Sequence, residues 1–182
     1  MPLATPAESA ATSEPVQKKA MQLVDLVKPH ESQALAVRFM TVISPIPLPP
    51  GVADCTVARA TPAIKEYIAA IYSKNISESD LSIAVDFFES KDGRRMVELR
   101  LQHERDLYES ATQGKTIANE QPEYPLQIRK ALERFGATAV GSELLGKDEL
   151  IWRQPFSKAI SDLRDSAMAV CIEQLSAHRA GS

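Results

Sequence analysis

The fold is decided by the stretch that begins Ser77-Glu-Ser-Asp-Leu81 and ends Phe87-Phe-Glu-Ser-Lys-Asp-Gly-Arg-Arg95. Ser77 and Asp80 resemble a capping box in which Asp takes the place of the usual Glu, so a helix is predicted to begin here. Apolar residues then recur at helical spacing, and Phe87 widens the stripe that they form. The residues of this stripe are Leu81, Ala84, Val85 and Phe88.

The second half of the stretch predicts a turn between two helices. Gly93 suits the residue just after the first helix, because a glycine takes positive φ without a Cβ clash. The next helix is predicted to start near Arg94 and to run to about Gln113. Two arginines at a helix N-terminus oppose the helix dipole, which predicts that Arg94 and Arg95 pair with Glu89 or Glu98, or meet an anionic partner.

The rest of the sequence also shows apolar residues at helical spacing. No segment alternates apolar and polar residues with the period of a strand, and Ser44–Gly51 is too rich in proline for a helix. We therefore expect an all-α protein, a single bundle of about six to seven helices built from helical hairpins. Further helices are predicted over about 13–28, 31–43, 61–75 and 125–136, with a weak helix over 137–150 and a last helix that Pro155 opens and that continues at least to Val170.

Composition sets the domain organisation and excludes several functions. The chain has 182 residues and a formal net charge of -3, which argues against nucleic-acid binding. No apolar run is long enough to span a membrane. Residues 1–14 have almost nothing to bury, so we expect a disordered leader followed by one domain over 15–182.

Catalytic, cofactor and metal motifs are missing from the sequence. His103-Glu104 begins like a zinc motif, but Leu107 stands where the second histidine belongs. His30 and His178 lie on other predicted elements. No nucleophile elbow, phosphate loop or dinucleotide fingerprint occurs. We predict no catalytic residue, no cofactor and no metal ion, and we expect His103 to be a hydrogen-bonded interior residue.

The two cysteines, Cys55 and Cys171, leave two alternatives open. They are either buried free thiols, as in a cytosolic protein, or one disulfide, as in an exported protein. The residues alone do not decide between the two.

The stretch that decides the fold also resembles a known family, the bacterial domain-of-unknown-function family numbered 2059. That family combines an acidic, capped helix start, an aromatic pair, Ser-Pro-x-Gly and one or two basic residues. The counterparts here are Ser77, Phe87, Phe88, Ser90, Gly93, Arg94 and Arg95, with Lys91 in place of the usual proline. The resemblance covers about residues 60–112.

This resemblance implies an all-helical protein exported to the periplasm of Gram-negative bacteria. It favours a disulfide between Cys55 and Cys171 over two free thiols. An exported chain would have lost its signal peptide, and we expect that here. The family has no established activity, so it supplies no catalytic residue, and residues 115–182 lie outside its motif.

We therefore expect a non-catalytic binding or protein-interaction module, with a protein partner or a small apolar ligand. Its functional surface is predicted in a groove between the helices 62–74, 78–90 and 94–113. A homodimer face on 94–113 is the alternative location. Two other functions stay open. One is a hydrolase of an envelope component that uses carboxylates among Glu66, Glu89 and Glu104. The other is an inhibitor or immunity protein for a partner enzyme.

Overall fold

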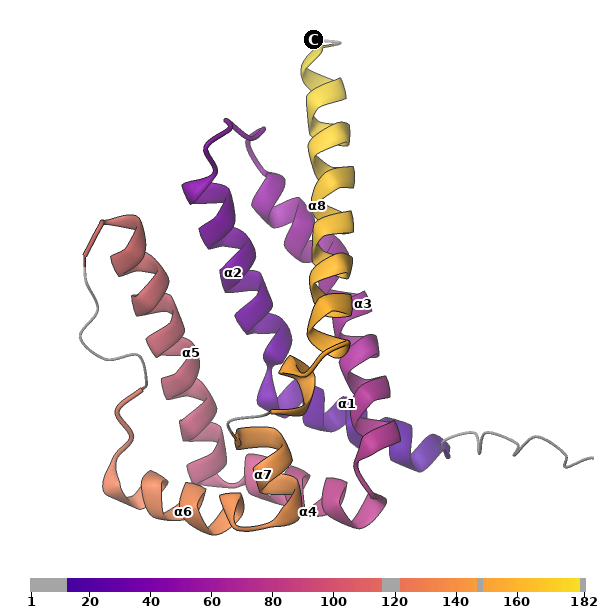
Figure 1. Ribbon diagram of the computed structural model, residues 1–182, viewed down its shortest axis with the longest axis vertical. Helices are drawn as coiled ribbons and strands as arrows, with labels where there is room; N and C mark the ends of the chain where they lie inside the picture. The colour runs from indigo at the N-terminus through magenta and orange to yellow at the C-terminus, as the bar shows by residue number, and fades with distance from the viewer. Residues whose placement is uncertain (1–12, 116–121, 147–148, 181–182) are drawn as a thin grey trace, which may run out of the picture.

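The protein is all-α in the computed structural model, which describes residues 13–115, 122–146 and 149–180. These residues form eight α-helices and one 3₁₀ turn, with no strand among them (Figure 1). The elements are α1 (Glu14–Val27), α2 (Pro29–Ile43), α3 (Val52–Asn75), α4 (Glu78–Glu89), α5 (Lys91–Thr112), α6 (Leu126–Gly136), α7 (Ala139–Leu145), η1 (Leu150–Trp152) and α8 (Phe156–Ala180). Apart from Ser13 and Glu14, which cap and begin α1, the predicted disordered leader lies outside the described residues.

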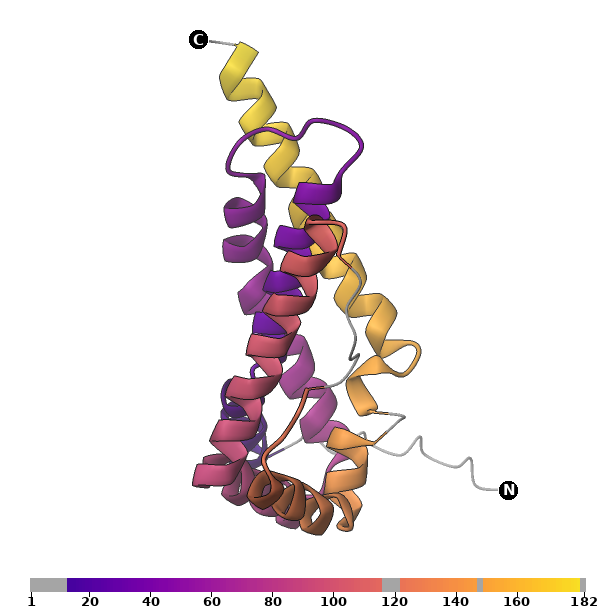
Figure 2. The same ribbon diagram turned by 90° about the vertical axis from the view of Figure 1, so that its left-hand side faces the viewer.

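The helices form an elongated bundle with a broader base. Helices α2, α3, α5 and α8 run along the long axis, whereas α1, α4 and α6 lie across it at one end (Figures 1 and 2). The largest fully buried side chains come from helices of both groups, so one core joins the base to the bundle. They include Leu23 of α1, Ile68 and Tyr72 of α3, and Leu81 and Phe88 of α4.

Helix α4 begins with the predicted Ser77 cap, and helix α5 begins with a Ser90 cap that was not predicted. The Ser77 hydroxyl accepts a hydrogen bond from the Asp80 backbone N–H at 3.1 Å. Ser90 ends α4 and caps α5, because its hydroxyl accepts a hydrogen bond from the Gly93 backbone N–H at 3.1 Å. Helix α5 therefore begins at Lys91, three residues before the predicted start, and Arg95 forms the predicted ion pair with Glu98 at 3.0 Å.

The predicted role of Gly93 was wrong. Gly93 is the third residue of α5 and does not have positive φ. A Cβ atom here would collide with the carbonyl oxygen of Phe87 and lie 2.8 Å from the Phe88 Cα atom. Glycine is required because two helices approach closely at this corner, and not because of its backbone freedom.

The prolines define helix ends less strictly than the sequence suggested. The helix predicted over 61–75, with Pro62 in its first turn, is the second part of α3, which begins at Val52 and has Pro62 inside it. Thr56, Ala60 and Ile64 form one buried face across the proline, so packing on both sides stabilises a continuous helix. Pro29 ends α1 as predicted, yet it is also the first residue of α2.

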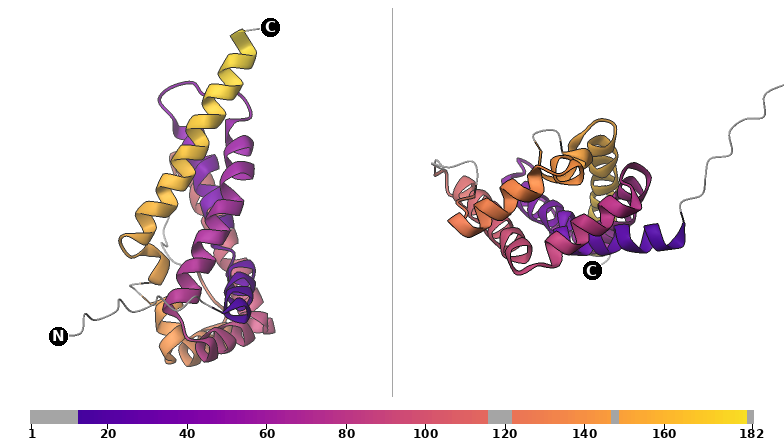
Figure 3. Two further views of the ribbon diagram at one scale, coloured as in Figure 1. Left: turned by 90° about the vertical axis from the view of Figure 1, so that its right-hand side faces the viewer. Right: turned by 90° about the horizontal axis from the view of Figure 1, so that it is seen from below.

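A disulfide between Cys55 and Cys171 joins α3 to α8, with their Cα atoms 5.9 Å apart. Helix α8 packs along α3 and continues past the loop between α2 and α3 (Figure 3). The segment 137–150, predicted as a weak helix, contains α7 and the first residue of η1. These two short elements carry the chain from the base back to α8.

Candidate binding cavity

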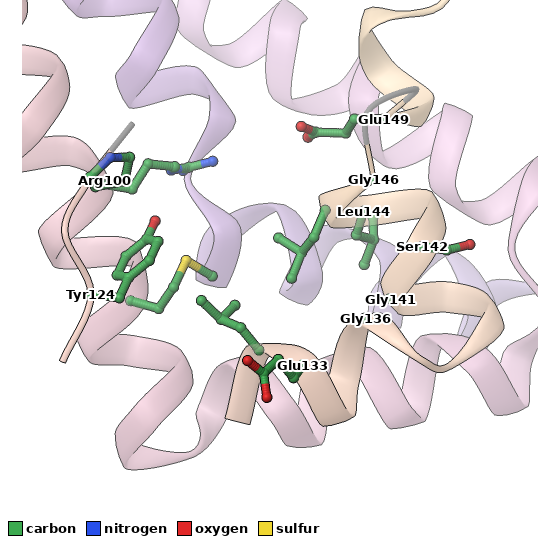
Figure 4. A pocket seen from close by; sticks show the side chains of 13 residues that line it. Arg100, Tyr124, Glu133, Gly136, Gly141, Ser142, Leu144, Gly146 and Glu149 are labelled. Atoms are coloured by element: carbon green, nitrogen blue, oxygen red, sulfur yellow. The ribbon is translucent and has the colours of Figure 1, made fainter. Parts of the chain in front are cut away.

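The main cavity, with a volume of about 540 Å³, lies between α5, α6 and α7 (Figure 4). This volume falls in the range of about 300–1,000 Å³ that is usual for small-molecule sites. The cavity is lined by Met96 and Arg100 of α5, Pro122 and Tyr124 of the following segment, Leu132, Glu133 and Gly136 of α6, Gly141, Ser142, Leu144 and Leu145 of α7, and Gly146 and Glu149.

The walls of the cavity are mostly apolar. Met96 and Arg100 share one face of α5 because they are four residues apart. Leu132 of α6 and Leu144 of α7 also line the cavity. An apolar lining with a few polar groups is the usual composition of a ligand site.

The α6–α7 wall is held by close packing and by a helix cap. The Thr138 hydroxyl caps α7 by accepting a hydrogen bond from the Gly141 backbone N–H at 3.0 Å. A Cβ atom at Gly141 would collide with the Phe135 carbonyl oxygen, so only glycine allows α7 to turn this tightly against α6. The Phe135 ring stacks on Phe87 with 4.0 Å between the ring centres, which fixes α6 to α4.

Arg100 forms one side of the cavity and is held by two contacts. Its Nη2 donates a hydrogen bond of 2.5 Å to the carbonyl oxygen of Val27, the last residue of α1. Its Nε lies 3.8 Å from the Glu104 carboxylate one turn along α5. A cation at a helix C-terminus is favourable, so Arg100 also stabilises the end of α1.

Glu149 lies across the cavity from Arg100 (Figure 4). Burial raises the pKa of its carboxyl to about 7, against the opposing effects of Arg100 and of a hydrogen bond from the Trp152 side chain, while Glu104 raises it further. The side chain is therefore divided between its neutral and ionised forms near neutral pH. A neutral carboxyl donates one hydrogen bond, whereas an ionised one accepts only.

Other polar groups lie close to Glu149 and Arg100. Tyr72 is fully buried, and its hydroxyl has no hydrogen-bond partner among the described residues. Burial raises the pKa of Tyr72 first, and the charge of Glu149 raises it further. Arg100 Nε and Glu104 Oε2 are also buried without a hydrogen-bond partner in this part of the chain. Such groups are uncommon in folded proteins. Of the three, only Arg100 is among the residues that line the cavity, where a polar ligand group or ordered water would reach it.

The carboxylates predicted for a hydrolase do not share a site. Glu66 lines a smaller cavity of about 300 Å³ together with Met21 of α1. Glu89 accepts a hydrogen bond of 2.7 Å from the Gln22 side chain, and Glu104 pairs with Arg100. Among the three, only Glu104 lies near the main cavity.

The structure also places the cavity away from the predicted groove. Helix α5 lines it as expected, but α3 and α4 do not, because α1 packs against both of them. Within the described ranges, no three His, Cys, Asp or Glu side chains are placed to hold a metal ion. His103 is partly buried, and its Nε2 has no hydrogen-bond partner among those residues, so the predicted hydrogen bond at this atom is not seen.

Sequence reasoning missed the residues that define the cavity. Arg100 interrupts the apolar residues of α5, and Glu149 directly precedes Leu150-Ile151-Trp152. A charged residue beside an apolar run is a weak signal for a partly buried charge. No sequence pattern indicated that these two charges, 49 positions apart in the chain, lie on one cavity.

Comparison with known proteins finds no match: no family model fits the chain, and no curated protein or solved structure is similar to it. Nothing in these comparisons bears on the resemblance of residues 60–112 to family 2059, which stays a prediction. The helices of the described part are too short or too polar to cross a bilayer. The disulfide is compatible with an exported protein.

Proposed function

We propose that this protein is a non-catalytic binding module of the bacterial periplasm that holds a small, largely apolar ligand between α5, α6 and α7. One observation carries the proposal. A cavity of about 540 Å³ has apolar walls and two opposed polar groups, Arg100 and Glu149. Apolar walls supply affinity, and a few placed polar groups orient the ligand.

The periplasmic location is the second part of this proposal. Its support is the disulfide between Cys55 and Cys171, a bond that persists in oxidising compartments and is rare in the cytosol. The test is a measurement of free thiols in denaturant, on protein isolated from the periplasm and, as a control, on protein reduced beforehand. Two free thiols in the periplasmic protein would contradict the assignment.

The resemblance to family 2059 supports the same conclusion. Lys91 replaces the family's proline at the first residue of α5, the helix position that accommodates proline best. The motif forms the corner between α4 and α5, and the Phe87 ring of this motif stacks on Phe135 of α6. In this proposal the motif builds the frame of the cavity, and the residues that line the cavity select the ligand.

Ligand binding can be followed through the protein's one tryptophan. The Trp152 side chain is hydrogen-bonded to Glu149, so a ligand that reaches Glu149 changes the surroundings of the indole. We expect a neutral amphiphile such as n-octanol to bind saturably and to change the tryptophan fluorescence. Absence of saturable binding would contradict the proposal.

A cavity-filling variant provides the matched test. Gly136 lines the cavity, and a Cβ atom built there meets nothing within 4 Å, so Gly136→Phe adds a ring without a backbone clash. Ala137→Phe is the control, because the next residue is exposed and does not line the cavity. We expect Gly136→Phe to weaken octanol binding and Ala137→Phe to leave it unchanged.

One observation favours the catalytic alternative, a hydrolase of an envelope component. Glu133 and Glu149 line the same cavity, and the raised pKa of Glu149 is typical of a general acid. This pair replaces the carboxylates predicted from the sequence. The test is hydrolysis of isolated envelope glycan by the protein and by Glu149→Gln, and an activity that Glu149→Gln abolishes would replace the binding proposal.

A further inference from the structure

The charges around the main cavity are unequal. Arg100 is the one basic side chain among its described lining residues, and it is already engaged by the Val27 carbonyl and by Glu104. Glu133 and Glu149 line the same cavity and form no ion pair with another residue of the described ranges. The lining residues that the structure describes therefore present a net negative charge to a ligand when Glu149 is ionised.

Of the two acidic lining residues, Glu149 is the more buried, so it would interact more strongly with a charged ligand than Glu133 would. The groups that face it are Arg100 and Glu104 of α5, Tyr72 of α3 and Trp152 of η1. Of these, only Arg100 carries a positive charge, and it lies on the opposite side of the cavity (Figure 4). Glu149 forms no ion pair with any residue that the structure describes, and a cation that enters beside such a partly buried carboxylate stabilises it strongly.

On the Arg100 side of the cavity, Tyr124 contributes an aromatic ring (Figure 4). Tyr124 lines the cavity and is partly buried, and burial raises the pKa of its hydroxyl, so the ring stays neutral near physiological pH. The face of a neutral aromatic ring attracts an ammonium group. An anionic head group would instead meet Glu133 and Glu149 and would find Arg100 already paired.

From this charge distribution we infer that the ligand is an apolar molecule with a cationic, ammonium-type head group that pairs with Glu149 inside the cavity. The inference rests on the proposed function and adds the chemical class of the ligand. Binding releases the proton of Glu149 whenever that group is protonated beforehand, so proton release accompanies binding below neutral pH.

Three probes with one apolar chain test the head group: n-octylamine is cationic, n-octanol neutral and octanoate anionic. Their affinities are measured by calorimetry on the full chain. At about pH 8 we expect octylamine to bind about tenfold or more tightly than octanol, and octanoate to bind most weakly. Between about pH 8 and about pH 6 the affinity for octylamine should fall about tenfold, because a carboxyl with a pKa of about 7 loses most of its charge over this interval.

Glu149→Gln removes the charge and keeps the shape of the side chain. In this variant we expect octylamine to bind no more tightly than octanol and its affinity to lose the pH dependence, while saturable octanol binding shows that the cavity is still folded. Glu133→Gln is the comparison. This exposed carboxylate should contribute about twofold, and its loss should leave the pH dependence in place.

The outcomes separate the two proposals. If octanol binds and Gly136→Phe blocks it, but octylamine has no advantage or octanoate binds most tightly, the inference of a cationic head group is wrong and the binding function stands. A preference for octylamine that survives in Glu149→Gln also overturns the inference. If none of the three probes binds, the proposed function fails as well.

Discussion

Replacing Glu149 by glutamine should stabilise the protein at high pH and have little effect at low pH. In the folded protein the pKa of this carboxyl is raised from 4.5 to about 7, mainly by burial. Between these two values the folded state holds a proton that the unfolded state has released. The free energy of unfolding therefore falls as the pH rises from 4.5 to about 7, and the loss is complete above that pH.

The size of the effect follows from the pKa shift. Each unit corresponds to about 1.4 kcal/mol, which gives about 3 kcal/mol for the full shift. Glu149 is only partly buried, so solvent screening lowers the expected value to about 2–3 kcal/mol. The amide of Glu149→Gln keeps an acceptor for the Trp152 side chain, so loss of that hydrogen bond should not obscure the gain.

The assay is urea unfolding of both proteins, followed by far-ultraviolet circular dichroism at several pH values. Groups common to both proteins cancel in the difference, including His30, whose lowered pKa makes both less stable in acid. We expect the variant to be more stable by about 2–3 kcal/mol at about pH 8 and equal within about 0.5 kcal/mol near pH 4. A difference that does not change with pH would refute the argument that Glu149 is held in a desolvated position.

Three other predictions concern stability and are measured by the same unfolding assay. Replacing Cys55 and Cys171 by serine opens a loop with a sequence separation of 116 and should lower the free energy of unfolding by about 5 kcal/mol in the chain-entropy model. A decrease below about 1 kcal/mol would show that the disulfide constrains the unfolded chain little. Gly93→Ala should lower the free energy of unfolding by about 3 kcal/mol or more, because the corner between α4 and α5 has no room for a methyl group. Gly136→Ala is the control, because position 136 has room, and it should be neutral or stabilising by up to about 1 kcal/mol. Equal effects of the two substitutions would contradict the packing argument. Ser90→Ala removes the N-cap of α5 and should lower the free energy of unfolding by about 1 kcal/mol. An unchanged midpoint of the urea unfolding transition would show that water replaces the serine hydroxyl.

Several features were predictable because they depend on local sequence. The cap at Ser77, the stripe from Leu81 to Phe88 and the proline-rich connector at Ser44–Gly51 require only nearby residues, and the structure has all three. The requirement for glycine at position 93 was also recognisable, although the reason given for it was wrong. Pro62 shows the limit of local rules, because the buried face of α3 continues across it.

The candidate site could not be predicted in this way. Its walls come from α5, the segment at Tyr124, α6, α7 and Glu149. Apolar periodicity predicts each helix separately, but it does not predict which helices pack against one another. Arg100 and Glu149 stand on opposite sides of one cavity only because Thr138 and Gly141 turn α7 tightly against α6. The placement of these two charges on one cavity and the raised pKa of Glu149 are properties of this packing.

The amino-acid sequence by itself therefore determined the helical class, the positions of most helix ends and the two cysteines available for a disulfide. These properties follow from backbone propensities, caps and apolar periodicity, which act over a few residues. Only the tertiary structure decided that Cys55 meets Cys171, that α1 takes the space between α3 and α4, and where the cavity lies. Those outcomes depend on side-chain volumes and on burial between helices distant in the chain, which no local pattern records.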